Sequence, residues 1–294
     1  KATSSGDKAT RAGFGAGLLE LGRNNPNVVA LTADLAGSLQ MNAFLEEFPD
    51  RFYQVGVAEA NMMGLAAGMA LSGLRPIVYT ITPFTTTRCF EQIRVDACYH
   101  NVPVIIVGTG SGLSYAELGP THHSCEDLAI LRVLPNMTVF APADEVELRQ
   151  CMRAALKLNG PVYIRIGKKG EQIIPKSNDV FEVGRSITIK QGSDVCLIGT
   201  GTIMPELLKA AEIMVSKGVS VANSSTTRAS IPSPLTSVRI PIKILGCCSA
   251  IKITYYLYNS VSLAQFDALV KSQRKKRSAM ALYCSFQKKN LIIQ

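Results

Sequence analysis

The segment QVGVAEANMMGLAAGMA, residues 54–70, joins the end of a predicted short strand to a predicted helix of small and apolar side chains. Glu59 is the only ionisable residue in this segment. A carboxylate among Gly, Ala and Met is poorly hydrated, so it either stays protonated or pairs with a basic group. Because buried acids are rare without a function, we expect Glu59 to be a functional residue.

Helical and strand patterns alternate around this segment, up to about residue 170. Residues 102–107 form a continuous apolar run, which is typical of a parallel sheet covered on both faces. The other predicted strands are 28–32, 52–55, 76–81, 137–140 and 162–166, and the predicted helices are 10–24, 85–99, 126–131 and 145–158. We therefore predict a doubly wound, mostly parallel α/β domain over residues 1–170.

A partial second α/β domain is predicted at residues 186–223, after a linker at 171–185 that is rich in Lys, Gly and Pro. Its pattern is strand 194–202, helix 204–217 and strand 219–222, which makes one βαβ unit. Gly199-Thr200-Gly201 is more typical of a tight turn than of a phosphate loop. Residues 224–294 are basic, rich in Ser and without such alternation; a frameshift, alternative splicing or a degenerate gene would explain the change.

Composition excludes several classes of protein. The net charge of +9 arises in the tail, and the first three quarters of the chain are nearly neutral, so we expect no nucleic-acid partner. No apolar run of about 18 residues exists to span a membrane. The eight cysteines have no CxxC spacing, and the first residues lack both a signal-peptide core and an initiator Met. We therefore expect the cysteines to be free thiols and the protein to be cytoplasmic. We also expect the sequence to be a fragment or a processed form, because it lacks an initiator Met.

Three further features accompany Glu59 at the ends of predicted strands. Phe84 follows strand 76–81, Asp34 follows strand 28–32, and the loop Gly119-Pro120-Thr121-His122-His123 presents imidazoles. Ligands of α/β sheets bind at the carboxyl ends of strands, so an acid, a ring and a histidine there can serve one pocket. Taken singly, Phe84 also suits a core, His122 a surface loop and Asp34 a helix cap.

These motifs resemble those of transketolases and of the related deoxyxylulose-phosphate synthases. Gly56-x-x-Glu59, Phe84 at 25 residues beyond the acid, and the Gly-Pro-Thr-His loop occur in the family's order. Residues 9–170 look like the family's pyrimidine-binding domain, and residues 180–223 look like the start of its C-terminal domain. The lone pyrimidine domain is similar to the C-terminal section, or small subunit, of a split transketolase.

The resemblance implies thiamine diphosphate as the cofactor. Glu59 would hydrogen-bond N1′ of its aminopyrimidine and Phe84 would stack on that ring, with Asp34 and Arg88 lining the cofactor pocket. His122 would be the second catalytic residue, contacting sugar oxygens with His123 beside it. Arg11 and Ser38 match positions that bind the acceptor's phosphate, for which an arginine fork is suited.

The sequence departs from the family at three positions. Leu118 stands where the family often has Asp, Ala141 where it has a phosphate-binding Arg, and Gly110 where it has a second His. Half of the phosphate cradle is therefore missing. Either the substrate is not the usual sugar phosphate, or a partner chain supplies the missing groups.

The family also binds Mg²⁺ through a Gly-Asp-Gly motif, and this chain has none. We therefore assign no metal ligands here, and expect a large partner subunit to bind Mg²⁺ and the diphosphate. Self-association is expected across the pyrimidine-domain face. The predicted activity is transfer of a two-carbon ketol unit between sugars, only in the presence of that partner. The alternatives are a β-type subunit of a 2-oxoacid dehydrogenase, a deoxyxylulose-phosphate-synthase-like enzyme, and a non-catalytic remnant or regulatory subunit.

Overall fold

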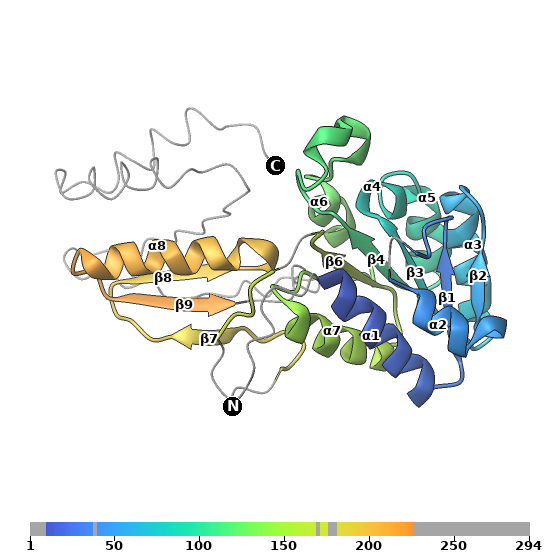
Figure 1. The fold of residues 1–294 in the computed structure, drawn as a ribbon, viewed down its shortest axis with the longest axis horizontal. Helices are drawn as coiled ribbons and strands as arrows, with labels where there is room; N and C mark the ends of the chain where they lie inside the picture. Colours follow the sequence, from blue (N-terminus) through green and yellow to red (C-terminus); the bar gives the residue numbers. More distant parts are fainter. Residues whose placement is uncertain (1–9, 38–39, 169–170, 176–180, 226–294) are drawn as a thin grey trace.

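The computed structural model describes residues 10–37, 40–168, 171–175 and 181–225, which form two sheets (Figure 1). The larger sheet has six strands in the order β2-β1-β3-β4-β6-β5, and all its pairs are parallel. The smaller sheet has the order β7-β9-β8. This confirms the predicted doubly wound α/β class, followed by a second, smaller α/β unit.

The elements of the larger sheet are bounded as follows. Its strands are β1 (Val28–Thr32), β2 (Phe52–Gln54), β3 (Arg75–Ile81), β4 (Ile105–Thr109), β5 (Thr138–Phe140) and β6 (Val162–Ile166). Its helices are α1 (Thr10–Asn24), α2 (Asn42–Glu47), α3 (Glu59–Leu71), α4 (Thr82–Thr85), α5 (Phe90–Gln92), α6 (Asp127–Arg132) and α7 (Glu145–Lys157). Three short 3₁₀ helices are η1 (Pro49–Arg51), η3 (Ala116–Leu118) and η4 (Pro120–His122), and η2 (Ile93–Tyr99) is a π-helix that follows α5.

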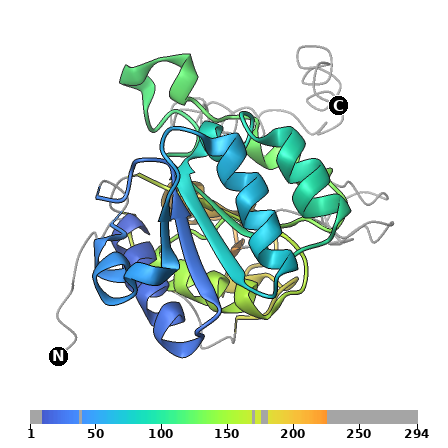
Figure 2. The same cartoon turned by 90° about the vertical axis from the view of Figure 1, so that its right-hand side faces the viewer.

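Helices cover both faces of the larger sheet (Figures 1 and 2). On one face Ile106 packs with Met62 and Met63 of α3, and on the other Ile105 packs with Phe14 of α1 and with side chains of α7. Alternate residues of each central strand thus enter two different cores. Burial on both faces is what makes the strands of a parallel sheet read as continuous apolar runs.

The predicted helix 85–99 is wrong as one continuous element. Helix α4 ends at Thr85, and the next helical turn begins at Phe90. The hydroxyl of Thr86 donates to the carbonyl of Thr82, and that of Thr87 donates to the carbonyl of Pro83. Such local side-chain bonds compete with helix hydrogen bonds, which explains the interruption after α4.

The smaller sheet contains the predicted βαβ unit. Strand β8 (Val195–Gly199) pairs in parallel with β9 (Val221–Ser225), and the connection runs through η5 (Gly201–Ile203) and α8 (Met204–Ser216). Strand β7 (Ile187–Lys190), which pairs antiparallel to β9, was not predicted. The predicted tail is residues 224–294; its first two residues, Ser224 and Ser225, belong to strand β9, and the rest lies outside the described residues.

Two buried acids join the smaller unit to the larger one. The carboxylate of Asp144 accepts hydrogen bonds from the backbone N–H of Glu147, at 2.8 Å, and of Ile174, at 2.9 Å. Glu147 accepts from the backbone of Ala143 and from the hydroxyl of Ser225 at the end of β9. Asp144 is thus both the N-cap of α7 and an anchor for the segment that leads to the smaller sheet.

None of the helices in the described part of the chain is long and apolar enough to cross a lipid bilayer.

Replacing Asp144 by Ala should lower the free energy of unfolding by about 2–4 kcal/mol, because two buried N–H groups lose their acceptor. Urea denaturation of the full chain measures the loss. Asp144→Asn keeps one acceptor oxygen and should lose only part of this stability. A loss of less than about 0.5 kcal/mol in Asp144→Ala, the range of ordinary surface substitutions, would show that the carboxylate does not hold this junction.

Candidate active site

Glu59 begins helix α3 at the carboxyl edge of the larger sheet and is 4% exposed. Its Oε1 accepts a 2.7 Å hydrogen bond from Nη1 of Arg88, whose side chain is 45% exposed. The positive end of the α3 dipole also favours a carboxylate at this position. Of the two states expected for the buried acid, the structure has the one with a basic partner.

Phe84 lies in α4, directly after the carboxyl end of β3. The guanidinium carbon of Arg88 is 4.0 Å from the centre of the Phe84 ring, which is a cation–π contact. Arg88 therefore contacts the Glu59 carboxylate and the Phe84 ring at the same time. A planar, nitrogen-bearing group fits between an acid and an aromatic ring at this edge of the sheet.

His122 lies against Phe84. Their ring centres are 5.1 Å apart, with an angle of 69° between the planes, an edge-to-face arrangement. The side chain of Thr121 contacts Nδ1 of His122 at 3.0 Å. His123 instead turns back on its own loop, where its Nε2 is 3.3 Å from the carbonyl oxygen of Ala116. The loop thus brings one of its two imidazoles to Phe84.

Tyr115 and Lys168 extend this cluster, although the sequence analysis did not single them out. The Tyr115 ring is 6.0 Å from the His122 ring, and Nζ of Lys168 is 3.9 Å from the Tyr115 ring centre. The feature of the sequence that could have pointed to Tyr115 is Gly110, which has a φ of 79°. A Cβ at that position would overlap the Tyr115 ring, so the glycine leaves room for the tyrosine.

The other predicted site residues lie elsewhere or outside the described residues. Asp34 follows β1 with a φ of 59°, and its backbone N–H donates to Oε1 of Gln54 at 2.7 Å. Arg11 lies in α1, where its charge acts on Glu171. Ser38 is outside the described residues. The contacts described here join Glu59, Arg88, Phe84 and His122 in one cluster, and place Asp34 beside β2.

Cys89 lies next to this cluster as a thiol with a raised pKa. Burial and the nearby Glu59 charge raise the pKa of Cys89 to about 12, so its thiol, which contacts the carbonyl of Phe84, stays protonated at neutral pH. Within the described part of the chain, no group of three or more His, Cys, Asp and Glu side chains is arranged to hold a metal ion.

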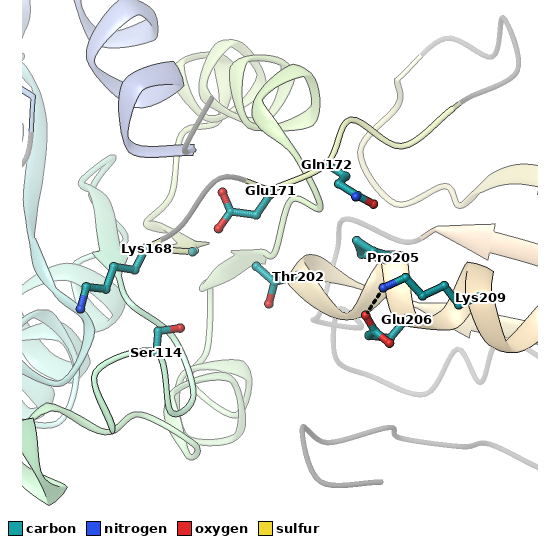
Figure 3. A pocket seen from close by; sticks show the side chains of 9 residues that line it. Ser114, Lys168, Glu171, Gln172, Thr202, Pro205, Glu206 and Lys209 are labelled. Atoms are coloured by element: carbon teal, nitrogen blue, oxygen red, sulfur yellow. Dashed lines mark hydrogen bonds and ion pairs between the residues drawn. The ribbon is translucent and has the colours of Figure 1, made fainter. Parts of the chain in front are cut away.

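A cavity of about 370 Å³ lies between the end of β6 and the start of α8 (Figure 3). Burial raises the pKa of Glu171 in its wall, opposed by a hydrogen bond from the backbone of Thr10. Glu206 and Lys209 form an ion pair of 2.7 Å, and the amino group of Lys168 turns away toward Glu117. The cavity lacks an acid beside an aromatic ring, so we place the candidate active site at Glu59.

Comparisons with known proteins identify the family of the larger α/β unit. A family model described as the transketolase pyrimidine-binding domain matches residues 7–170. A provisionally named transketolase C-terminal section from Methanocaldococcus jannaschii is 40% identical over 215 residues, which are 72% of this chain and 68% of that protein. A 1-deoxy-D-xylulose-5-phosphate synthase from Carboxydothermus hydrogenoformans is 38% identical over 71% of this chain and 33% of that protein. A solved split-gene transketolase, described as an inactive β4 tetramer, is 38% identical with a TM-score of 0.70, covering 76% of this chain and 73% of that chain.

A double-mutant cycle tests the ion pair of Glu59 and Arg88. Arg88→Met should cost about 1–3 kcal/mol of unfolding free energy, because it leaves a buried carboxylate without its partner, and less in a Glu59→Gln background. The matched control is the exposed pair of Glu91 and Arg94, for which the coupling should stay below about 1 kcal/mol. Equal coupling in the two pairs would contradict the interpretation.

Gly110→Ala should destabilise the protein more than Gly73→Ala. Both glycines have a positive φ, but a side chain at position 73 meets no atom within 4 Å, whereas one at position 110 overlaps Tyr115. Backbone strain alone accounts for about 1 kcal/mol, and overpacking adds about 1–3 kcal/mol at position 110. Thermal or urea unfolding measures both, and Tyr115→Ala should rescue Gly110→Ala but not Gly73→Ala.

Proposed function

Because this chain belongs to the family of the transketolase pyrimidine-binding domain, we propose that it is the small subunit of a thiamine-diphosphate-dependent transketolase. With a partner subunit it would transfer a two-carbon ketol unit between sugars. The observation that carries the proposal is the cluster in which the buried Glu59 meets a planar cation stacked on Phe84.

The residues of the cluster fit the aminopyrimidine ring of the cofactor. Arg88 serves as a stand-in, because its guanidinium is planar, bears N–H donors and touches both Glu59 and Phe84. An aminopyrimidine presents the same features, a flat face for stacking and nitrogen atoms for a carboxylate. The Glu59 carboxylate and the Phe84 ring therefore suit the aminopyrimidine ring of thiamine diphosphate.

Each residue then has a defined task. Glu59 shares a proton with N1′ of the aminopyrimidine, a task for which a carboxylate withdrawn from water is suited. Phe84 stacks on the ring. Arg88 yields its place on Glu59 and Phe84 to the ring and lines the cofactor pocket beside it. His122 donates or accepts hydrogen bonds at the sugar's oxygens. When bound, the cofactor supplies the electron sink for cleaving the bond beside a ketose carbonyl.

The diphosphate and Mg²⁺ are proposed to bind to a large partner subunit. Mg²⁺ that binds a diphosphate takes one or two carboxylates together with phosphate oxygens and water. The Gly-Asp-Gly motif that supplies such a carboxylate in the family does not occur in this sequence. The related split-gene transketolase is described as an inactive tetramer of its β subunit. That description supports two parts of the proposal, namely that this chain self-associates and that it is inactive without the partner. We propose the pyrimidine-domain face as the surface of self-association.

The departures from the family bear on the substrate. Tyr115 occupies the space that a side chain at position 110 would need, so an imidazole at that position has no room. Together with Ala141 and Leu118, this supports a substrate other than the usual sugar phosphate, or anion-binding groups that come from the partner. Asp34, Arg11, Ser38 and His123 stay proposed contacts of cofactor and substrate.

A second candidate is a deoxyxylulose-phosphate-synthase-like enzyme or a β-type subunit of a 2-oxoacid dehydrogenase. The 38% identity to a synthase, over 71% of this chain, favours the synthase-like enzyme of these two. Such an enzyme would use the same Glu59 and Phe84 but a 2-oxoacid donor. A third candidate, a regulatory or remnant subunit, would keep the fold without turnover.

Reconstitution with a candidate large subunit tests the proposal. The pair should bind thiamine diphosphate and transfer a ketol unit, and Glu59→Gln should lower the rate about 10²-fold or more, the usual effect of losing an acid–base group. Glu212→Gln, an exposed substitution on α8, is the matched control and should keep full activity. Isothermal titration of the cofactor and a coupled ketose assay are the measurements.

The three candidates predict different results in this assay. A pair that acts on 2-oxoacids but not on ketoses supports the second candidate. A stable pair that binds no cofactor removes both enzyme candidates and leaves the regulatory subunit.

A further inference from the structure

A polar network is buried behind the candidate site, in the core between the larger sheet and its helices. Asp127, at the start of α6, and Tyr163, on β6, are both fully buried. The Tyr163 hydroxyl donates to Oδ2 of Asp127 at 2.7 Å, and Nε of Arg165 is 3.1 Å from the same oxygen. Burying such groups costs free energy, and an apolar core of the same shape would be at least as stable.

One end of this network reaches the helix that carries Phe84. Gly108 of β4 has no side chain, and a Cβ there would meet the Tyr163 hydroxyl at 2.9 Å and Oγ1 of Thr82 at 3.0 Å. The Tyr163 and Thr82 hydroxyls therefore face the same gap, which the missing side chain of Gly108 leaves open. Thr82 is the first residue of α4, and its hydroxyl donates to the carbonyl of Thr109 at the end of β4. Phe84 follows two residues later.

The other end reaches the loop that carries His122. Nη2 of Arg165 donates to the carbonyl of Ser124 at 3.2 Å. The backbone of Ser124 also forms two hydrogen bonds with that of Gly112, of 2.8 and 2.9 Å. His122 lies two residues before Ser124. The network therefore connects, through the interior, the two segments whose rings meet edge to face.

We propose that Asp127, Tyr163 and Arg165 are positioning residues that set the His122 ring against the Phe84 ring. The roles of Phe84 and His122 in turnover rest on the proposed function, but their mutual geometry does not. The two rings come from α4 and from the loop at η4. Arg165 hydrogen-bonds to the loop segment, and the Tyr163 hydroxyl faces Thr82, the first residue of α4, across Gly108. Asp127 joins the two halves, because both Tyr163 and Arg165 contact its Oδ2.

Burial is also the largest influence on the ionisation of Asp127. It raises the pKa of the carboxyl, and Arg165 and Tyr163 oppose that shift. The two partners thus favour the charged form, which accepts a hydrogen bond from Tyr163 and forms an ion pair with Arg165. Removing either partner should loosen the connection without emptying the core.

Histidine NMR of the full chain, without cofactor or partner, tests the inference. The chain has three histidines, His100, His122 and His123, so imidazole signals can be assigned by single His→Gln variants. The Phe84 ring shifts the His122 signals through its ring current, and Phe84→Leu gives the position without that shift. In Tyr163→Phe and Asp127→Asn, we expect the His122 signals to move most of the way to that position, while the His100 signals stay.

Tyr79→Phe is the matched control. Tyr79 is also fully buried but lies on the opposite face of the sheet, where its ring packs against Phe14 with centres 4.1 Å apart. The Tyr79→Phe substitution also removes one buried hydroxyl oxygen, and it should leave the His122 signals unchanged. If Asp127→Asn does not fold, Tyr163→Phe carries the test, because it keeps the volume of the core.

The inference is overturned if His122 signals in folded Tyr163→Phe match those of the unaltered chain, even where stability falls. Because no cofactor is present, this result is independent of the reconstitution assay. In a reconstituted pair that is active, Tyr163→Phe should lower kcat more than it changes KM. A displacement of a catalytic group by about 1 Å can lower the rate about 10²-fold.

Discussion

All six strands of the larger sheet run in one direction, and the candidate site follows from that constraint. Their carboxyl ends meet at one edge, where the chain leaves β2 for α3, β3 for α4 and β4 for the His122 loop. Three segments that are distant in sequence thereby deliver Glu59, Phe84 and His122 to one place. The same constraint requires cover on both faces, which α3 supplies on one side and α1 with α7 on the other.

Two buried acids next to the site each lie beside an arginine, but in different settings. Glu59 and Arg88 meet at the edge of the sheet, where the arginine is half exposed and can yield to another planar group. Asp127 and Arg165 meet deeper, under the loop and the helix that carry the two rings. An interior that served stability alone would do without either charge. The contact of Arg88 with Glu59 can therefore be replaced by a bound ligand, whereas the contact of Arg165 with Asp127 suits a permanent support for the two segments.

The smaller sheet meets the larger one at a different place from the Glu59 cluster. Its junction uses the buried carboxylates of Asp144 and Glu147, and a cavity with charged walls lies beside α8. The half-exposed side of Arg88 belongs to the edge of the larger sheet. The proposed large subunit would complete the site at that edge, which is why a lone chain would hold only the ring half of the cofactor.

Local patterns were enough for the fold class and for part of the site. Apolar periodicity reports which face of an element is buried, so strands β1, β3 and β6 and helices α1 and α7 were predicted nearly to their ends. A lone acid in a helix of small residues is visible in one dimension, which is why Glu59 stood out. The break after α4 was missed, because periodicity does not show that threonine hydroxyls satisfy the backbone there.

The pairing of side chains was decided by the tertiary structure. Arg88 is 29 residues from Glu59, and Tyr163 is 36 residues from Asp127; Lys168 reaches Tyr115 from another strand end. No pattern in a single sequence marks such pairs, because they depend on the order in which the strands lie in the sheet. The sequence by itself determined which elements form and which acid is unusual. The sheet order decided which partners those residues meet, because hydrogen bonds and ring contacts act only over a few ångströms in space.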